Sequence, residues 1–437
     1  MRLPLALISL AAVALTPGIA LAANSAPSVG ADFREKRPDR PRLNGFLHGM
    51  DKGTPPAERI TPLRPGLWRA IPSSAPYGRA VDFGARYEVV LSDTWGYPNA
   101  DWYGRFPPWQ NLAAWEAHVR AAARQARNTG VIFDIWNEPD DVSFWNGTRE
   151  QFFETYLVAY RALRDELGPD LMVGGPSLAR YDAGYIEEFL AFCRARGCEV
   201  NVLSWHEIYD PIPATADHVA EARTRFVNKA VNAPLRMSEI HVNETGRQSD
   251  QYHPGELLGY LRYLEKGGAD AAARACWDDA AGRTDCQRHT LDGLLVPRTF
   301  EPRAAWWAAK EYADGLETRV ASSSSDENVV TLASSRSPAS TSAQLLVGRL
   351  DPRPKRSVPA KVDVAVELEG LQKLPFLRGD ERVRVTIDRI TASGESPLAA
   401  PVRVRTQDVS MHRNTAELTL KDLRVHEAFV VTLSAWP

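Results

Sequence analysis

The stretch Ile132-Phe133-Asp134-Ile135-Trp136-Asn137-Glu138-Pro139 decides the fold of this chain. Apolar residues run through it and end abruptly in a polar pair, Asn137 and Glu138. A short apolar run of this kind is typical of a buried strand in a parallel α/β sheet. Pro139 cannot donate a hydrogen bond to a neighbouring strand, so we expect the strand to end there. The pattern predicts a strand that carries Asn137 and Glu138 at its carboxyl end.

Working outward, seven more runs of this kind surround the first, and amphipathic helical segments separate the later ones. The predicted strands are Leu43–Met50, Leu67–Ala70, Tyr87–Ser92, Val131–Asn137, Leu171–Gly174, Val202–Tyr209, Leu235–Ile240 and Ala272–Trp277. Eight strands that alternate with helices predict an α/β fold, the (β/α)₈ barrel. The first two repeats are weak, because 50–67 has room for only a stub of helix and 72–81 for hardly any. We therefore expect the barrel to be irregular on that side.

The composition and the pattern of the sequence change after Leu316. Serine- and proline-rich stretches there surround short alternating strands without helices, which predicts an appended β-sandwich. The 437 residues, 44% of them hydrophobic, are enough for more than one domain. The predicted organisation is a leader at 1–22, an N-terminal arm at 23–42, a barrel at 43–317 and a β-sandwich domain at 318–437.

The first 22 residues are typical of a secretory signal peptide. Met1-Arg2 precedes an apolar run, Pro17-Gly18 breaks that run, and Ala20-Leu21-Ala22 supplies small residues for cleavage. A membrane anchor is the rival interpretation, but the run is barely long enough to span a bilayer and contains a proline. We expect cleavage after Ala22, a periplasmic or secreted protein, and no stable membrane insertion after cleavage.

The four cysteines agree with export. Cys193 lies close to Cys198, and Cys276 lies close to Cys286, which suits two short-loop disulfides in an oxidising compartment. Zinc is the alternative, but the spacing is not that of CxxC pairs and the chain has no HExxH motif. We expect no metal and no cofactor. The formal net charge of −3 gives no indication of a nucleic-acid partner.

The segment Trp136-Asn137-Glu138-Pro139-Asp140, followed by Phe144-Trp145, resembles the acid/base segment of glycoside hydrolase family 39. That family belongs to the clan of barrel glycosidases with Asn-Glu at the end of strand four. The resemblance covers roughly 43–316 and implies that Glu138 is the acid/base and that Asn137 binds the sugar 2-hydroxyl. In a barrel of this kind catalytic groups sit at the carboxyl ends of strands, where Glu138 is expected.

A second carboxylate is expected at the end of strand seven. Ser238-Glu239 resembles the family's nucleophile motif, although the residues that follow depart from the commoner members. Glu244 is a rival, but we expect it beyond the strand on an exposed loop. Two carboxylates are needed because cleavage must protonate the leaving group and stabilise an oxocarbenium-like centre. At about 5–5.5 Å apart the second attacks directly, and the configuration is retained.

Further substrate-binding residues follow from strand positions. His206 and Tyr209 lie at the end of strand six, where the clan commonly places a His and a nearby Tyr. Strict alternation puts Tyr209 on the face opposite His206, so it reaches the cleft only if the strand ends or bulges between them. Arg69 on strand two fits a clan position that supports the nucleophile.

Three tryptophans are candidate sugar platforms. The resemblance expects a tryptophan at the end of strand eight as the floor of the sugar site, and Trp277 matches it. Trp95 lies after strand three and Trp145 after strand four, where rings on the catalytic rim can stack on sugars. Packing in the core is the alternative for each.

Together these features predict a retaining glycoside hydrolase that cleaves a poly- or oligosaccharide by double displacement, with carbohydrate as its partner. An exo-acting, β-xylosidase-like glycosidase is the alternative among enzymes. The stunted early repeats leave open a non-catalytic carbohydrate-binding protein on a decayed barrel.

Overall fold

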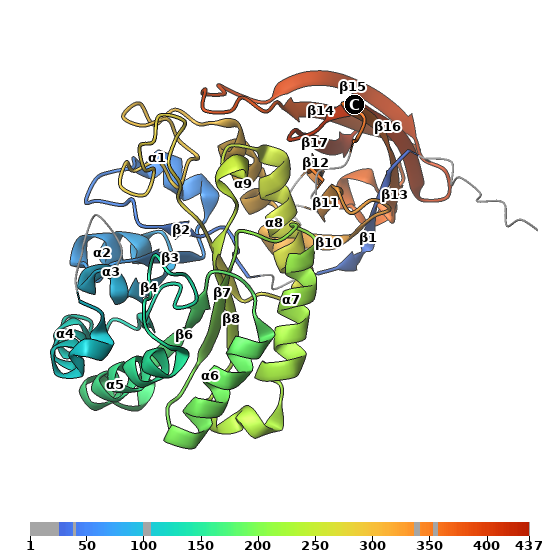
Figure 1. The fold of residues 1–437 in the computed structure, drawn as a ribbon. Coiled ribbons are helices and arrows are strands. Elements are labelled where there is room, and N and C mark those ends of the chain that lie inside the picture. Colours follow the sequence, from blue (N-terminus) through green and yellow to red (C-terminus); the bar gives the residue numbers. More distant parts are fainter. Residues whose placement is uncertain (1–25, 38–40, 99–105, 336–340, 353–356, 437) are drawn as a thin grey trace, which may run out of the picture.

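The computed structural model describes residues 26–37, 41–98, 106–335, 341–352 and 357–436. Two parts are visible in Figure 1, a barrel with surrounding helices and a curved β-sheet beside it. The predicted leader at 1–22 lies outside the described residues. Within the described ranges, no helix combines the length and apolar character that crossing a membrane requires.

The barrel is an eight-stranded sheet in which every strand is parallel to its neighbours and the spatial order follows the chain. Its strands are β2 (Phe46–Leu47), β3 (Leu67–Ala70), β4 (Arg86–Val90), β5 (Ile132–Asp134), β6 (Met172–Leu178), β7 (Val202–Glu207), β8 (Glu239–Thr245) and β9 (Ala271–Arg274). The N–H of Arg274 donates to the carbonyl of Gly45 at 3.0 Å and joins β9 to the segment before β2. A Cβ on Gly45 would lie 2.1 Å from the carbonyl oxygen of Ala272, so closure needs glycine. The predicted barrel is confirmed.

The helices follow the predicted order with some differences. They are α1 (Ala57–Ile60), α2 (Ser74–Asp82), α3 (Ser92–Trp95), α4 (Leu112–Gln125), α5 (Arg149–Leu167), α6 (Ala183–Arg196), α7 (Ala214–Ala222), α8 (Pro254–Gly267) and α9 (Ala304–Asp314). Helix α1 is the expected stub, but the near absence of helix at 72–81 was wrong, because α2 is nine residues long. At the start of α5, Thr148 and Gln151 form a reciprocal capping box, which fixes where this helix begins.

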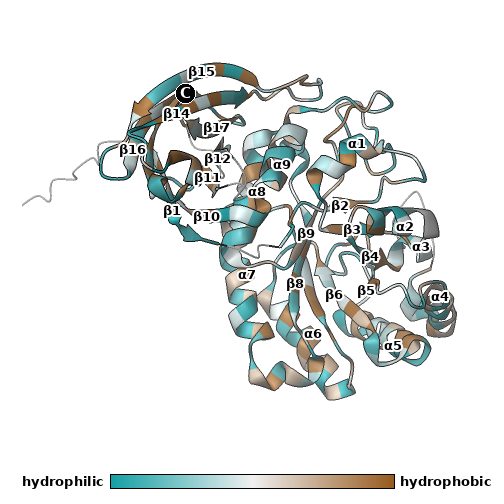
Figure 2. Ribbon diagram, turned by 180° about the vertical axis from the view of Figure 1, so that it is seen from behind, coloured by the Kyte–Doolittle hydropathy of each residue, from teal (hydrophilic) through white to brown (hydrophobic). Residues whose placement is uncertain are grey.

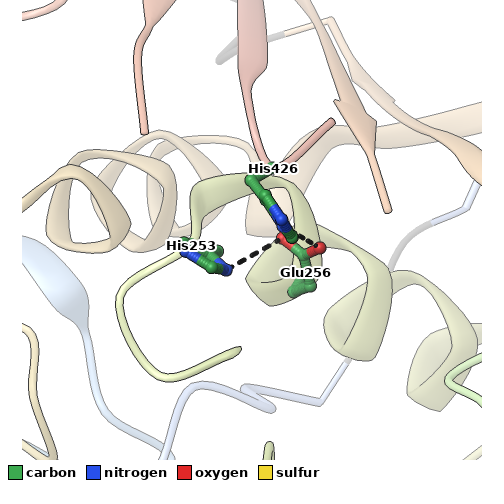
Figure 3. Close-up of side chains that lie close together, drawn as sticks. All are labelled: His253, Glu256 and His426. Carbon is green, nitrogen blue, oxygen red and sulfur yellow. Dashed lines mark hydrogen bonds and ion pairs between the residues drawn. The ribbon is translucent and has the colours of Figure 1, made fainter. Parts of the chain in front are cut away.

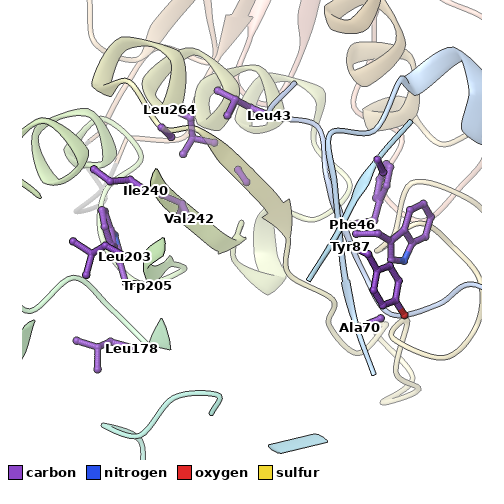
Figure 4. Close-up of a cluster of buried hydrophobic side chains, with 14 of the residues drawn as sticks. Leu43, Phe46, Ala70, Tyr87, Leu178, Leu203, Trp205, Ile240, Val242 and Leu264 are labelled. Atoms are coloured by element: carbon purple, nitrogen blue, oxygen red, sulfur yellow. The ribbon is translucent and has the colours of Figure 1, made fainter. Parts of the chain in front are cut away.

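Hydrophobic side chains fill the space between the barrel strands and the helices. Leu203 and Trp205 of β7 and Ile240 and Val242 of β8 are fully buried there, and Leu264 of α8 covers this layer (Figure 4). Helix α7 carries both hydrophobic and hydrophilic residues, as an amphipathic surface helix does (Figure 2). This layer holds the strands in register and leaves their alternate side chains to face the barrel interior.

The second sheet has nine strands in the order β15-β14-β17-β12-β11-β10-β1-β13-β16. They are β1 (Ser28–Lys36), β10 (Arg319–Ser324), β11 (Val329–Ser334), β12 (Ser342–Arg349), β13 (Lys361–Glu369), β14 (Arg382–Ile390), β15 (Val402–Ser410), β16 (Thr415–Arg424) and β17 (Ala428–Ala435). The sheet curves so that β15 and β16, at opposite ends of the order, are in contact around a separate hydrophobic core. This is the sandwich-like architecture that the alternating strands predict.

The predicted N-terminal arm is part of this second sheet. Strand β1 lies between β10 and β13, antiparallel to the first and parallel to the second, as the blue strand beside the orange ones in Figure 1 shows. Just after it, the N–H of Arg37 donates to the carbonyl of Arg319 at 2.7 Å. The chain therefore enters the barrel and leaves it at adjacent points.

One of the two predicted disulfides is present. Cys276 and Cys286 are bonded, which confirms that pair. The prediction of a Cys193–Cys198 disulfide was wrong, because both are buried thiols at the end of α6. Burial raises the pKa of the Cys193 thiol, so little of the thiolate that disulfide formation needs is present.

Candidate active site

Glu138 lies just beyond the carboxyl end of β5, the fourth barrel strand, and its side chain is buried. Its backbone is in the left-handed region, with φ of 49°, and its N–H donates to the carbonyl of Ser177 at 2.9 Å. A non-glycine residue held in this region often marks a functional site. One hydrogen bond of 2.7 Å joins Oε1 of Glu138 to Nδ1 of His206 at the end of β7.

Burial, with a smaller contribution from the charge of Asp141, raises the pKa of Glu138 to about 7. Burial also lowers the pKa of His206 to about 4, although the charge of Glu244 opposes the shift. Near neutral pH the imidazole is therefore uncharged, and a large fraction of Glu138 carries its proton. Nε2 of His206 has no hydrogen-bond partner among the described residues.

Glu244 is the carboxylate that meets Glu138. It lies near the carboxyl end of β8, the seventh barrel strand, where one carboxylate oxygen is 2.8 Å from Nη1 of Arg69 and 3.8 Å from Nε2 of His206. Ligand atoms of Glu138, His206 and Glu244 all lie within 4.8 Å of one another. Two carboxylates from distant parts of the chain therefore face each other across the mouth of the barrel.

A β-bulge aims Glu244 at this position. Trp205 pairs with Val242 and the next residue, His206, pairs with Glu244, so Asn243 is the extra residue in β8. Strict alternation would put Glu244 on the same outward face as Ile240 and Val242. The bulge instead turns both Asn243 and Glu244 towards the barrel axis.

Glu239, predicted to face Glu138, lies at the opposite end of the barrel. It is the first residue of β8 and pairs with Val202, the first residue of β7. The predicted strand 235–240 was misplaced, because Ala230–Leu235 forms a 3₁₀ helix and the strand starts only at residue 239. At about 3.3 Å per residue, roughly 16 Å of strand separates Glu239 from Glu244. The structure does not bring Glu239 and Glu138 together.

Glu239 is paired with basic groups at that amino end. Nη1 of Arg86 lies 2.5 Å and Nε2 of His241 lies 2.8 Å from its carboxylate. Burial alone would raise the pKa of Glu239, but these hydrogen bonds outweigh it and lower the pKa to about 2. Nδ1 of His241 is in turn 2.7 Å from Glu88, so the two acids enclose one imidazole.

Arg69 on β3 connects the carboxylates of the upper barrel. Besides Glu244, its guanidinium donates to Asp134 at 2.6 Å and to the amide oxygen of Asn137 at 2.8 Å. The side chain is 1% exposed, and the carboxylates around it keep its pKa above the usual range despite burial. The structure places Arg69, Asn137 and His206 at the same end of the barrel as Glu138. Arg69 was expected to support Glu239 as the nucleophile, but it contacts Glu244 instead.

The predicted aromatic residues divide into two groups. Trp95 and Trp145 are buried at 3% and 4% exposure and pack edge to face on Trp115 and Trp136, so the alternative of core packing holds for both. Tyr209 is 45% exposed beyond the end of β7, with the guanidinium of Arg180 over its ring. Trp277 follows β9, is partly exposed, and donates its indole N–H to the carbonyl of Gly246 at 2.9 Å.

Sequence reasoning assigned no role to four polar residues that support the site. The amide of Asn243 donates to Glu88, Asp134 and Ser177 at 2.9–3.2 Å, and all four side chains are buried. A sequence feature that points to Glu244 is the pair Asn243-Glu244, which repeats the pair Asn137-Glu138 three strands further round the barrel.

Glu138, His206 and Glu244 also form one of the groups whose spacing a metal ion accepts. The guanidinium of Arg69 lies 2.8 Å from Glu244 and adds a fixed positive charge at the same place. This charge repels a cation there. It also lowers the pKa of Glu244, although burial outweighs it and the pKa is raised overall.

The parallel barrel thus holds paired carboxylates at the ends of its fourth and seventh strands. Residues 96–240 match the family described as Glycosyl hydrolases family 39. Over that segment, about a third of its length, the chain is similar to this family.

Two curated relatives are bacterial β-xylosidases. The chain is 29% identical to one from Geobacillus stearothermophilus over 120 residues, which is 26% of this chain and 24% of that protein. It is 31% identical to one from Caldicellulosiruptor saccharolyticus over 134 residues, which is 28% of this chain and 27% of that protein. The chain therefore matches these relatives over about a quarter of their length.

Solved structures match over nearly the whole chain and show the fold. N2152 from Neocallimastix frontalis has a TM-score of 0.75 at 18% identity, covering 94% of this chain and 100% of that one. The family 39 enzyme from Xanthomonas axonopodis pv. citri has a TM-score of 0.64 at 16% identity, covering 97% and 100%. A monomeric β-xylosidase from Caulobacter crescentus has a TM-score of 0.64 at 14% identity, covering 94% and 100%.

Proposed function

We propose that this protein is a retaining glycoside hydrolase in which Glu138 is the acid/base and Glu244 is the nucleophile. The observation that carries the proposal is the approach of their carboxylates, with atoms of both and of His206 within 4.8 Å. Retaining glycosidases hold their two carboxyl groups about 5–5.5 Å apart, whereas inverting ones leave about 6.5–9.5 Å for a water molecule. The separation favours direct attack. This assignment replaces Glu239, the nucleophile that the sequence motif indicated.

In the first step the protonated Glu138 gives its proton to the glycosidic oxygen as the bond to the anomeric carbon breaks. The Glu244 carboxylate attacks that carbon and forms a glycosyl ester. In the second step Glu138, now ionised, takes a proton from water, and the resulting hydroxyl displaces Glu244. The sugar leaves with its original configuration, and both carboxyl groups return to their starting states.

The surrounding charges suit these two roles. Arg69 contacts Glu244 and favours its ionised form, although burial raises the pKa of this carboxyl. Among the described residues no guanidinium forms an ion pair with Glu138, whose hydrogen-bond partner is the uncharged His206. Because Arg69 holds the amide oxygen of Asn137, the amide N–H groups remain to donate to the sugar 2-hydroxyl.

We infer that the substrate is a poly- or oligosaccharide that lies across the barrel mouth. Tyr209, which is exposed after β7, and Trp277, which is partly exposed after β9, are the proposed stacking surfaces. Exo-acting cleavage of β-xylosides is the second candidate, and the two β-xylosidase relatives favour it. The export expected from the leader remains part of the proposal, and the Cys276–Cys286 bond is compatible with an oxidising compartment.

The test is the anomeric configuration of the first product. Purified protein is screened against aryl β-glycosides and polysaccharides, and the product of the best substrate is followed by proton NMR before it mutarotates. We expect the configuration of the substrate to be kept. Inversion would contradict the roles assigned to Glu138 and Glu244, and binding without product release would favour the carbohydrate-binding alternative. A 2-fluoro sugar that traps a covalent adduct, followed by peptide mapping, should place the label on Glu244.

A further inference from the structure

A second cluster of ionisable side chains lies where the barrel meets the curved sheet, well away from β5 and β8. His253 precedes α8, Glu256 is in its first turn, and His426 is in the turn between β16 and β17. Figure 3 shows both imidazole rings directed at the Glu256 carboxylate. One nitrogen from each ring and one carboxylate oxygen lie within 4.8 Å of one another.

Backbone contacts fix this cluster in place. The N–H of Gly255 donates to the carbonyl of His426 at 3.1 Å, and the N–H of His426 donates to the carbonyl of Arg349 at 2.9 Å. A Cβ on Gly255 would lie 2.3 Å from the carbonyl oxygen of Arg349, so the helix start and the sheet touch directly. The three side chains come from both domains, and these backbone contacts hold the segments that carry them together.

Glu256 has unused coordination capacity although it is almost completely buried, at 1% side-chain exposure. Its Oε1 accepts from the N–H of Asp351 at 2.9 Å and lies 2.6 Å from Nδ1 of His426. Its Oε2 has no hydrogen-bond partner among the described residues and lies 3.9 Å from Nδ1 of His253. A buried carboxylate oxygen without a donor is costly, and a cation would remove that cost.

The donor atoms are of the kinds that a borderline divalent cation binds. Two imidazoles and one carboxylate are a common three-ligand set for Zn²⁺, with water in the fourth position. With metal–ligand distances of about 2.1 Å, tetrahedral ligand atoms are about 3.4 Å apart. Nδ1 of His426 lies 2.6 Å from Oε1 of Glu256, and Nδ1 of His253 lies 3.9 Å from Oε2. The two imidazole rings are stacked with centroids 3.9 Å apart, so they must turn apart for both nitrogens to bind one ion. The two histidine side chains are 21% and 30% exposed, so water and a metal ion can reach the cluster.

We propose that His253, Glu256 and His426 bind one Zn²⁺ ion that joins the barrel to the C-terminal sheet. Nδ1 of each histidine and a Glu256 oxygen are the ligands, and solvent supplies the remainder. The charges of Asp250 and Asp351 act on His426 and add to the attraction for a cation. The role is structural, because the ion ties α8 to the turn that follows β16.

The test uses the full mature chain, stripped of metal by dialysis against a chelator and then against metal-free buffer. ZnCl₂ is titrated by calorimetry, and thermal unfolding is followed with and without zinc. We expect saturation at one zinc per chain and a midpoint raised by a few degrees, since a ligand that binds only the folded state stabilises it. Absence of saturable binding would overturn the proposal.

Substitutions at the proposed ligands, with matched controls, test where the ion binds. His253→Ala and Glu256→Gln should weaken binding by at least about tenfold and abolish the rise in midpoint. Circular dichroism checks that both variants fold. If Glu256→Gln does not fold, His253→Ala alone tests the site. His412→Ala, on an exposed turn of the same sheet, should bind zinc like the parent. Glu244→Gln should also bind normally, and loss of binding in this variant would place the ion at the barrel mouth and refute the proposed site. This outcome is independent of whether glycoside cleavage is observed.

Discussion

The two ends of the barrel contain similar residues in opposite electrostatic states. At the carboxyl end, His206 lies between Glu138 and Glu244. At the amino end, His241 lies between Glu88 and Glu239. The pKa of Glu138 is raised to about 7 and that of His206 is lowered to about 4, in both cases mainly by burial.

The amino end shows the reverse shifts. The pKa of Glu239 is lowered to about 2, and that of His241 is raised, because their mutual hydrogen bonds outweigh burial. The difference lies in the completeness of pairing: His241 has an acid on each ring nitrogen, whereas Nε2 of His206 has no hydrogen-bond partner in the described part of the chain. Complete pairing fixes charges and stabilises the fold. Incomplete pairing leaves a proton available for transfer, which is what catalysis needs.

The largest expected effect is a loss of activity that distinguishes the carboxyl end of the barrel from the amino end. Glu244→Gln should lower kcat/KM by about 10⁴-fold or more, the order seen when an enzyme loses its nucleophile. Glu239→Gln, a matched change on the same strand, should retain activity within about threefold, because it lies far from the site. Steady-state kinetics on one aryl glycoside compares the pair. If Glu239→Gln were the inactive variant, the comparison of the two ends would be reversed.

The acid/base residue should show a loss that depends on the leaving group. Glu138→Gln removes the transferable proton, which is worth about 10²–10⁴-fold for a poor leaving group. An activated nitrophenyl substrate needs little protonation, so its first step should be much less impaired. Pre-steady-state measurements on both substrates test this, and an equal loss on the two would mean that Glu138 does not protonate the leaving group.

Arg69 should affect rate and pH dependence together. Arg69→Lys keeps the charge but loses the geometry that reaches Glu244, Asp134 and Asn137 at once. We expect kcat/KM to fall by about 10–100-fold and the acid limb of the pH profile to move upward, because the Glu244 anion is less favoured. A normal acid limb in a folded variant would show that Arg69 does not control the ionisation of Glu244.

The pH profile tests the raised pKa of Glu138 in the unmodified protein. Only the protonated form can act as acid, so kcat/KM should fall above an apparent pKa near 7. The carboxylates titrate as a coupled group, so this value belongs to the site as a whole. A profile that is flat from pH 6 to 9 would contradict the assignment.

The smallest effect concerns stability at the amino end. Glu239→Gln should cost about 1 kcal/mol of unfolding free energy at neutral pH, because His241 and Arg86 lose a charged partner. The folded-state pKa of Glu239 is below its unfolded value of about 4.3, so its contribution is present above that value and is lost as the pH falls towards 2. Urea unfolding at pH 7 and pH 3 should show a difference between variant and parent that shrinks at the lower pH.

Much of the fold follows from local sequence. Seven of the eight barrel strands lie at or near their predicted segments, because a buried parallel strand is a continuous apolar run between polar turns. The exception is β8, which starts four residues later than predicted. Glu138 is positioned by such a run. One feature could not be predicted because it depends on distant contacts: β1 pairs with β10 and β13, roughly 300 and 340 residues further along the chain.

The second carboxylate could not be assigned from the motif alone. Leu235 was predicted to lie in a strand because it is apolar and follows a proline, but it is the last residue of a 3₁₀ helix. Alternation then places Glu244 outward, and only the bulge at Asn243, which is set by pairing with β7, turns it inward. Likewise, the burial of Trp95 and Trp145 depends on how α4 and α5 pack, which their positions in the sequence do not reveal.

The hydrogen bond between Arg37 and Arg319 has a consequence for how this molecule can be cut and joined. Since the first strand belongs to the last sheet, the barrel is topologically an insertion within the sandwich rather than a domain in front of it. A barrel excised at these two positions has ends that already meet, so it tolerates cyclisation or circular permutation. Truncation after the barrel alone instead leaves β1 without partners, as an exposed edge that invites aggregation.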